Sequence, residues 1–256
     1  MIRTFTLAMA VSTGLGAQWL NYPAPGIPRL PDGKPNLSAP TPRTPDGKPD
    51  LYGIWKSDNL LTQGALGQTT LTFPIKPEDV ILTREGEVLP RRRNENYFPG
   101  AECLPITLPR HTAVQPFKIF PLRGTVVILY EHQTTYRQIF MDGRELPKDP
   151  NPTWRGYSVG KWDGDTLVAD TSGFNDDEEI LPGRRPHSDA LHIIERYRRP
   201  DFGHLEIQFT IDDPTVYAKP WRFKEEFHLT PDTELLEYIC NENEKDLKHM
   251  VGGGRQ

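Results

Sequence analysis

The sequence has little of what a nucleic-acid-binding or membrane-spanning protein requires. Its formal net charge is -5, and no run of five like charges occurs in it. Phosphate groups are bound by clustered lysine and arginine, so we expect neither nucleic acid nor an anionic membrane surface as a partner. The apolar stretch Phe5–Gly16 is too short to span a bilayer, so we expect no membrane insertion.

Motifs for common cofactors are missing as well. Neither the P-loop pattern nor the G-x-G-x-x-G dinucleotide pattern occurs. The spacing of His187, His192 and His204 matches no specific metal-ligand pattern. The sequence therefore predicts no bound cofactor and no metal site.

Cysteine is scarce, with only Cys103 and Cys240 in the chain. Two cysteines alone cannot complete a four-ligand structural zinc site. In an oxidising compartment the two could form a disulfide, and two free buried thiols are the alternative. Both states are compatible with the sequence.

The N-terminus has the layout of a secretory signal. One positive charge, Arg3, precedes about a dozen mainly apolar residues, and small residues follow near Ala17. We expect residues 1–17 to be a signal peptide and the mature protein to be periplasmic or secreted.

Proline dominates residues 18–50, which contain two near-copies of one phrase, Pro31–Leu37 and Pro45–Leu51. Proline fixes φ and Pro-Asp-Gly favours turns, so we expect an extended arm with two tight turns rather than a domain. The arm is either a disordered linker or a segment laid over the barrel mouth or a neighbouring subunit.

From residue 51 to residue 250 the hydrophobic pattern has mainly period two, which predicts β-strands. The expected strands are Thr69–Phe73, Gly124–Glu131, Thr135–Met141, Tyr157–Trp162, Asp165–Thr171, Leu191–Tyr197, His204–Ile211, Trp221–Leu229 and Leu235–Cys240. Only Lys76–Arg93 has a partly helical pattern, and Pro90 is expected to cut it short. This pattern is typical of a mainly β fold, a single antiparallel barrel of about 8–10 strands, followed by a flexible tail at residues 251–256.

Two hairpins predict which side chains face the interior. A turn at Asp163–Gly164 would place Tyr157 opposite Asp170 on an otherwise apolar face. The loop Arg199–Gly203 would pair Ile193 with Phe209, and Glu195 with Ile207. In this register Glu195 lies within an apolar face, and the strand Trp221–Leu229 places Glu225 in the same situation. A buried carboxylate must be paired, protonated or next to a wet cavity, and Arg137 and Arg196 are the available cations.

Several phrases resemble a family of exported bacterial proteins that has no assigned activity. They are Asp46–Trp55, Gly160–Thr171 and His187–His192 with Glu195 and Arg196, and the match runs over most of the chain after the signal. The resemblance implies export and a lipocalin-like barrel. It transfers no catalytic residues.

The leading functional hypothesis is a cofactor-independent lyase, hydratase or isomerase that acts on a small, partly aromatic molecule inside the barrel. His187 would be the general acid or base, with Asp189 as its orienting group. The substrate would be bound by Arg137, Tyr136, Tyr157, Glu195 and Glu225. The alternatives are a non-catalytic carrier of an apolar ligand, and a protein that binds partners through its arm and an edge strand; homo-oligomerisation stays open.

Overall fold

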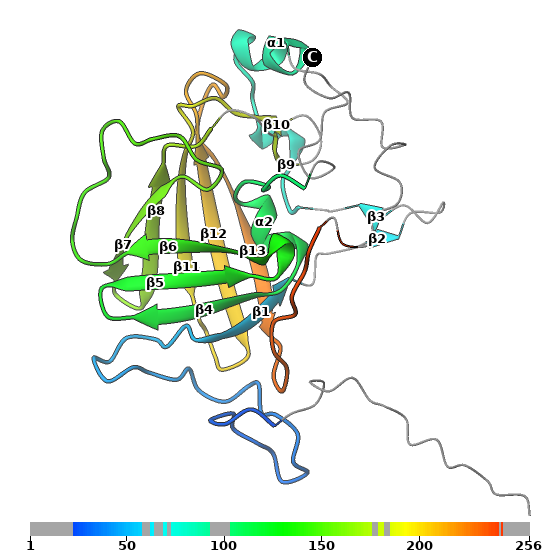
Figure 1. Cartoon of the computed structure of the whole chain (residues 1–256), viewed down its shortest axis with the longest axis vertical. Helices are drawn as coiled ribbons and strands as arrows, with labels where there is room; N and C mark the ends of the chain where they lie inside the picture. The colour runs from blue at the N-terminus through cyan, green and yellow to red at the C-terminus, as the bar shows by residue number, and fades with distance from the viewer. Residues whose placement is uncertain are drawn as a thin grey trace, which may run out of the picture.

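The chain folds into a closed barrel of nine strands in a computed structural model that describes residues 23–57, 62–63, 69–70, 73–92, 103–175, 179–181, 185–240 and 242 (Figure 1). The strand order around the barrel is β1-β13-β12-β11-β8-β7-β6-β5-β4. Their bounds are β1 Gly53–Ser57, β4 Phe117–Leu122, β5 Thr125–Tyr130, β6 Thr135–Phe140, β7 Tyr157–Asp163, β8 Thr166–Ser172, β11 His192–Arg198, β12 His204–Asp212 and β13 Trp221–Leu229. The prediction of a mainly β barrel is confirmed. The expected signal peptide (1–17) and tail (251–256) lie outside the described residues.

Short elements lie outside the barrel. They are the strand pairs β2 Thr62–Gln63 with β3 Thr69–Thr70 and β9 Glu179–Leu181 with β10 Arg185–Pro186, the helices α1 Arg84–Arg92 and α2 Arg110–Val114, and the 3₁₀ turns η1 Pro77–Asp79 and η3 His132–Thr134. No helix in the described part of the chain is long and apolar enough to cross a membrane.

One pair of barrel strands is parallel, so the expectation of a purely antiparallel barrel is wrong at this point. β6 and β7 pair only through Ile139 with Ser158 and Phe140 with Val159. Parallel neighbours need a connection that carries the chain back to the starting end, and residues 141–156 form it.

The helical segment differs from its prediction at both ends. α1 begins only at Arg84, because the Thr83 hydroxyl caps it by accepting a hydrogen bond from the Gly86 N–H at 3.0 Å. Pro90 lies inside α1 rather than ending it. A proline removes one backbone hydrogen bond, and here that loss falls in the last turn of the helix.

Both predicted hairpins form, with a register shifted by two residues. Tyr157 pairs with Ser172 instead of Asp170, and Ile193 pairs with Ile211 instead of Phe209. Side chains alternate with period two, so after a shift of two the residues that were expected to share a face still share one. The residues Ile193, Glu195, Tyr197, Leu205, Ile207, Phe209 and Ile211 are all buried and form the predicted inner face.

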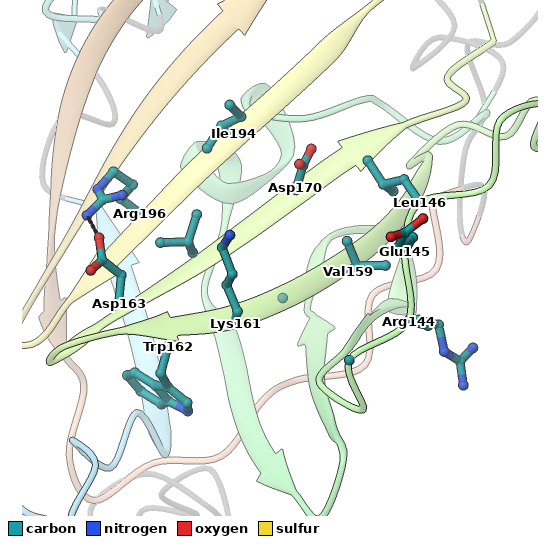
Figure 2. A pocket seen from close by; sticks show the side chains of 13 residues that line it. Arg144, Glu145, Leu146, Val159, Lys161, Trp162, Asp163, Asp170, Ile194 and Arg196 are labelled. Carbon is teal, nitrogen blue, oxygen red and sulfur yellow. Dashed lines mark hydrogen bonds and ion pairs between the residues drawn. The ribbon is translucent and has the colours of Figure 1, made fainter.

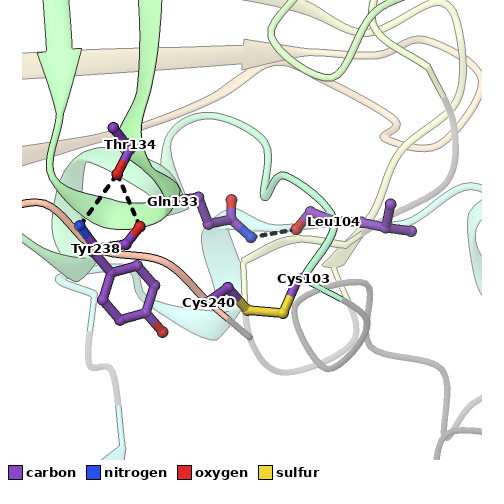
Figure 3. Close-up of a disulfide and its surroundings, with 6 residues drawn as sticks. All are labelled: Cys103, Leu104, Gln133, Thr134, Tyr238 and Cys240. Atoms are coloured by element: carbon purple, nitrogen blue, oxygen red, sulfur yellow. Dashed lines mark hydrogen bonds between the residues drawn. A yellow bond between two sulfur atoms is a disulfide. The ribbon is translucent and has the colours of Figure 1, made fainter. Parts of the chain in front are cut away.

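Cys103 and Cys240 form a disulfide, with 5.5 Å between their Cα atoms (Figure 3). Beside it, the Thr134 hydroxyl donates to the Tyr238 carbonyl at 2.8 Å and accepts from the Tyr238 N–H at 3.2 Å. These contacts attach the segment after β13 to the turn between β5 and β6. Because the disulfide and the Thr134 contacts hold this segment, Leu235–Cys240 is irregular rather than the expected strand.

The proline-rich arm lies against one end of the barrel (Figure 1). The Phe202 N–H donates to the Ala39 carbonyl at 2.8 Å, and the Gly203 N–H donates to the Leu37 carbonyl at 2.7 Å. The arm therefore runs along the loop between β11 and β12.

Each repeat of the arm forms a tight turn, residues 29–35 and 43–49, that we call a clasp. Arg29 donates to the Gly33 carbonyl at 3.2 Å in the first clasp, and Arg43 donates to the Gly47 carbonyl at 2.7 Å in the second. The same arginines bind carboxylates of the barrel: Arg29 binds Asp232, after β13, and Arg43 binds Asp165, in the β7–β8 turn. The sequence repeat is therefore a structural repeat.

Candidate ligand site in the barrel interior

A buried charged network crosses the barrel interior between β6 and β11. Arg137 donates to Glu195 through both terminal nitrogens, at 3.0 Å from Nη1 to Oε1 and in a second, shorter bond from Nη2 to Oε2. Its remaining donors reach the Ser158 hydroxyl at 3.0 Å and the Thr171 hydroxyl at 2.7 Å. The Tyr197 hydroxyl donates to Glu195 Oε1 at 2.8 Å. Each charge is therefore paired and hydrogen-bonded, as a buried ion pair requires.

The electrostatics of this network favour the ion pair. Burial alone would lower the pKa of Arg137, but the adjacent Glu195 outweighs it and the pKa is raised. Burial and the Glu195 charge both raise the pKa of Tyr197 well above 10.0. Glu195 thus faces inward, as predicted, with its oxygens bound by protein groups.

Glu225 is the opposite case. It lies on the inner face of β13 between Phe223 and Phe227, and its direct partner on β12 is Ile207. Both carboxyl oxygens are buried without a hydrogen-bond partner, and burial raises the pKa of Glu225 to about 8. The side chain is therefore mainly protonated at neutral pH.

Aromatic rings surround this part of the wall. Phe223 stacks on Phe209 with ring centroids 4.9 Å apart, and on Trp221 at 5.8 Å. Phe227 meets Phe117 edge-on at 5.3 Å. Glu225 thus projects from an aromatic and aliphatic surface.

The predicted catalytic pair does not come together. His187 is fully buried in the segment between β10 and β11, edge-on to Phe174 at 6.5 Å. Asp189 is exposed, because Ser188–Leu191 forms a turn in which the Leu191 N–H donates to the Ser188 carbonyl at 3.2 Å. His187 and Asp189 also lie outside the strand that carries Glu195, since β11 begins only at His192.

The two predicted tyrosines face away from the interior. Tyr136 is 64% exposed, because it neighbours the inward Arg137 on the same strand and adjacent strand residues point to opposite faces. The Tyr157 hydroxyl accepts a hydrogen bond from Arg144 at 2.9 Å, and its ring stacks on Phe140 at 5.2 Å. Neither tyrosine joins Arg137 around a common ligand position.

Ser158 belongs to a G-x-S-x-G match, Gly156–Gly160, the pattern of a hydrolase nucleophile elbow. That role needs a strand-to-helix turn and an adjacent base, whereas Ser158 lies within β7 with its hydroxyl bonded to Arg137 and Thr171. Its part here is to complete the charged network.

A group missed by the sequence analysis lies where β5 meets β6. His111 is buried 4.3 Å from the Tyr130 ring and 5.3 Å from His132, between ring centroids. Burial and the Arg155 charge lower the pKa of His111 well below 6.5, and the same causes lower that of His132 to about 4. Both histidines are neutral at physiological pH. His111 lies on the short helix α2 and His132 on the 3₁₀ turn η3, and both elements are too short for hydrophobic periodicity to indicate which way a side chain points.

A groove of about 840 Å³ lies on the outer wall (Figure 2). Val159, Val168 and Ile194 are among its apolar lining residues, and Asp163 pairs with Arg196 at its edge at 2.7 Å. Asp170 also lines it, so Asp170 and Tyr157 share the outer face rather than the predicted inner one.

Comparisons with known proteins add one distant likeness. No protein-family model and no curated protein sequence matches the chain. A solved structure, a "secretary abundant heat soluble (SAHS) protein" from Ramazzottius varieornatus, aligns over 70% of this chain and 95% of its own, with 13% identity and a TM-score of 0.33.

Proposed function

We propose that the protein is a non-catalytic carrier that binds a small, largely apolar molecule inside its barrel. Glu225 carries this proposal. A buried polar group without a partner costs about 1–3 kcal/mol, and native proteins leave few such groups unless a ligand, water or ion completes them. A ligand that contacts the aromatic surface around Glu225 would supply the missing partner.

Acid–base catalysis by His187 and Asp189, the leading hypothesis from the sequence, has less support. General acid–base chemistry needs groups that converge on one reacting atom. His187 is packed in a loop, Asp189 is exposed, and both oxygens of Glu195 are occupied by Arg137 and Tyr197. Within the predicted set, Glu225 has both carboxyl oxygens buried without a hydrogen-bond partner.

We also propose that the protein is exported. The signal-like residues 1–17 and the Cys103–Cys240 disulfide support this, because disulfides persist in oxidising compartments. Intact-mass analysis of protein recovered from the periplasm or medium should show a chain without Met1. A mass that includes Met1 would defeat the proposal.

The carrier function can be tested with N-phenyl-1-naphthylamine, an apolar probe whose fluorescence rises in a dry site. We expect saturable binding to the wild-type protein. Ile207→Trp should abolish it by placing a much larger side chain on the inner wall directly opposite Glu225, whereas Gln208→Trp, one residue along on the outer face, should leave it unchanged.

Thermal unfolding would verify that both variants are folded. The carrier proposal fails if the probe does not bind saturably to the wild type. It also fails if the two variants bind the probe equally, because the site would then lie outside the barrel.

A further inference from the structure

We infer that the ligand of the barrel is an organic cation, an ammonium group on an apolar or aromatic body, and that its charge lies against the Glu225 carboxylate. This inference rests on the proposed carrier function and names the chemical class of its ligand. It stands on what surrounds Glu225 on each described neighbouring strand.

The described wall around Glu225 supplies no cation. On β13 its inward neighbours are Phe223 and Phe227, and on β12 the facing side chains are Leu205, Ile207 and Phe209. On β1, the other neighbour of β13, the buried Ser57 lies opposite Phe227. These side chains are aliphatic, aromatic or, in Ser57, a neutral hydroxyl, so none of them can neutralise a carboxylate.

The nearest lysine on the same strand points to the other side of the wall. Lys224 pairs there with Glu226 at 2.8 Å and with Glu206 at 3.4 Å. Inside the barrel, β6 contributes Arg137 and β11 contributes Glu195 and Tyr197, and these three are bonded to one another. The interior charges of the described strands therefore balance without Glu225, which is left to pair with an incoming charge.

An ammonium group fits this setting better than a neutral or anionic group. It would form charge-assisted hydrogen bonds with the carboxylate and favourable contacts with the faces of nearby aromatic rings. A neutral alcohol would gain only ordinary hydrogen bonds, and an anion would be excluded by the apolar wall and the carboxyl group.

Cation binding also has a stoichiometric consequence. Glu225 is mainly protonated in the free protein at neutral pH, because burial raises its pKa to about 8. The ion pair requires the ionised carboxylate, so the Glu225 proton must leave to solvent as the ammonium enters. Binding of an amine should therefore release a proton, while binding of a neutral analogue should not.

The test uses three probes with one apolar body: 1-naphthylmethylamine, 1-naphthalenemethanol and 1-naphthoic acid. Isothermal titration calorimetry at pH 7 in two buffers of different ionisation enthalpy gives both affinity and proton release. We expect the amine to bind at least about tenfold more tightly than the alcohol, and the acid to bind most weakly. The amine should release up to one proton, and the alcohol none.

Glu225→Gln is the matched variant, because it keeps the shape of the side chain and removes its charge. It should bind the alcohol as the wild type does, lose the preference for the amine and release no proton. Equal binding of amine and alcohol by the wild type, without proton release, would overturn the inference and leave the carrier function standing. If none of the three probes binds in the barrel, the carrier function fails as well.

Discussion

Two inward carboxylates, Glu195 and Glu225, have opposite surroundings, and the sequence alone could not distinguish them. Period-two alternation predicted correctly that both face the interior. The partner of Glu195 is Arg137, which lies 58 residues away on a strand that is not adjacent to β11. Such a contact across the barrel depends on closure of the whole sheet, and no hairpin rule specifies it. Local pattern therefore predicted burial but not pairing.

Glu225 should make the stability of the protein depend on pH. Its ordinary pKa is 4.5 and the folded barrel raises it to about 8, so between these values the unfolded state loses a proton that the folded state keeps. Rising pH then favours unfolding. Relative to Glu225→Gln, the wild-type unfolding free energy should fall by about 1.4 kcal/mol per pH unit over this interval.

Urea denaturation of both proteins at a series of pH values measures this slope. Below pH 4.5 and above pH 8 the difference between the two proteins should be constant. A pH-independent difference across the whole range would show that Glu225 has an ordinary pKa.

His187 should contribute to stability. Its ring is fully buried against Phe174, so His187→Ala should leave a cavity and lower the unfolding free energy by about 1–3 kcal/mol. Asp189→Asn, on the exposed turn, should change it by less than about 0.5 kcal/mol. Thermal and urea unfolding of the two variants compare them directly, and an unchanged stability of His187→Ala would contradict the packing role.

At the scale of strands and turns, the sequence predicted the central hairpins and missed β1 and β4, the two strands whose pairing closes the barrel. β4 escaped because Pro121 lies within it and proline is depleted in strands. β1 was missed because it has only five residues, too few to show a clear period-two pattern directly after the proline-rich arm. The two-residue slip in both hairpins also has a physical reason: Asp165 and Arg199–Gly203 are held by the arm, so long-range contacts set the turns.

Lysine substitutions along β12 test the register. Leu205→Lys should destabilise by about 3 kcal/mol or more, because it buries a charge opposite Phe227. Ile207→Lys should cost less, since its direct partner is Glu225 and the two can form an ion pair. Gln208→Lys, on the outer face, should be nearly neutral.

The double variant Ile207→Lys with Glu225→Gln supplies the control. It cannot form the ion pair between residues 207 and 225, so it should be destabilised as much as Leu205→Lys. Urea denaturation gives the four free energies. Equal losses for Leu205→Lys and Ile207→Lys would show that Glu225 is not the neighbour of residue 207.

For the molecule as a whole, the disulfide is the main covalent constraint. It joins residues 137 positions apart, and closing so long a loop stabilises a fold by about 5 kcal/mol in the chain-entropy account. Replacing Cys103 and Cys240 by serine should lower the unfolding free energy by that amount. Reductant should destabilise the wild type equally and leave the variant unchanged, and two alkylatable thiols in the native wild type would contradict the bond.

The two clasps of the arm impose an order in time on the maturing chain. Arg43 finds its barrel carboxylate 122 residues later in the sequence, and Arg29 finds its own 203 residues later. A chain is synthesised from its N-terminus, so the arm emerges first yet has nothing to bind until the hairpins are complete. The second clasp can bind Asp165 once β7 and β8 have formed, and the first can bind Asp232 only after β13 has been made. The ion pair between Arg29 and Asp232 is therefore the contact that forms only when the last strand of the barrel is present.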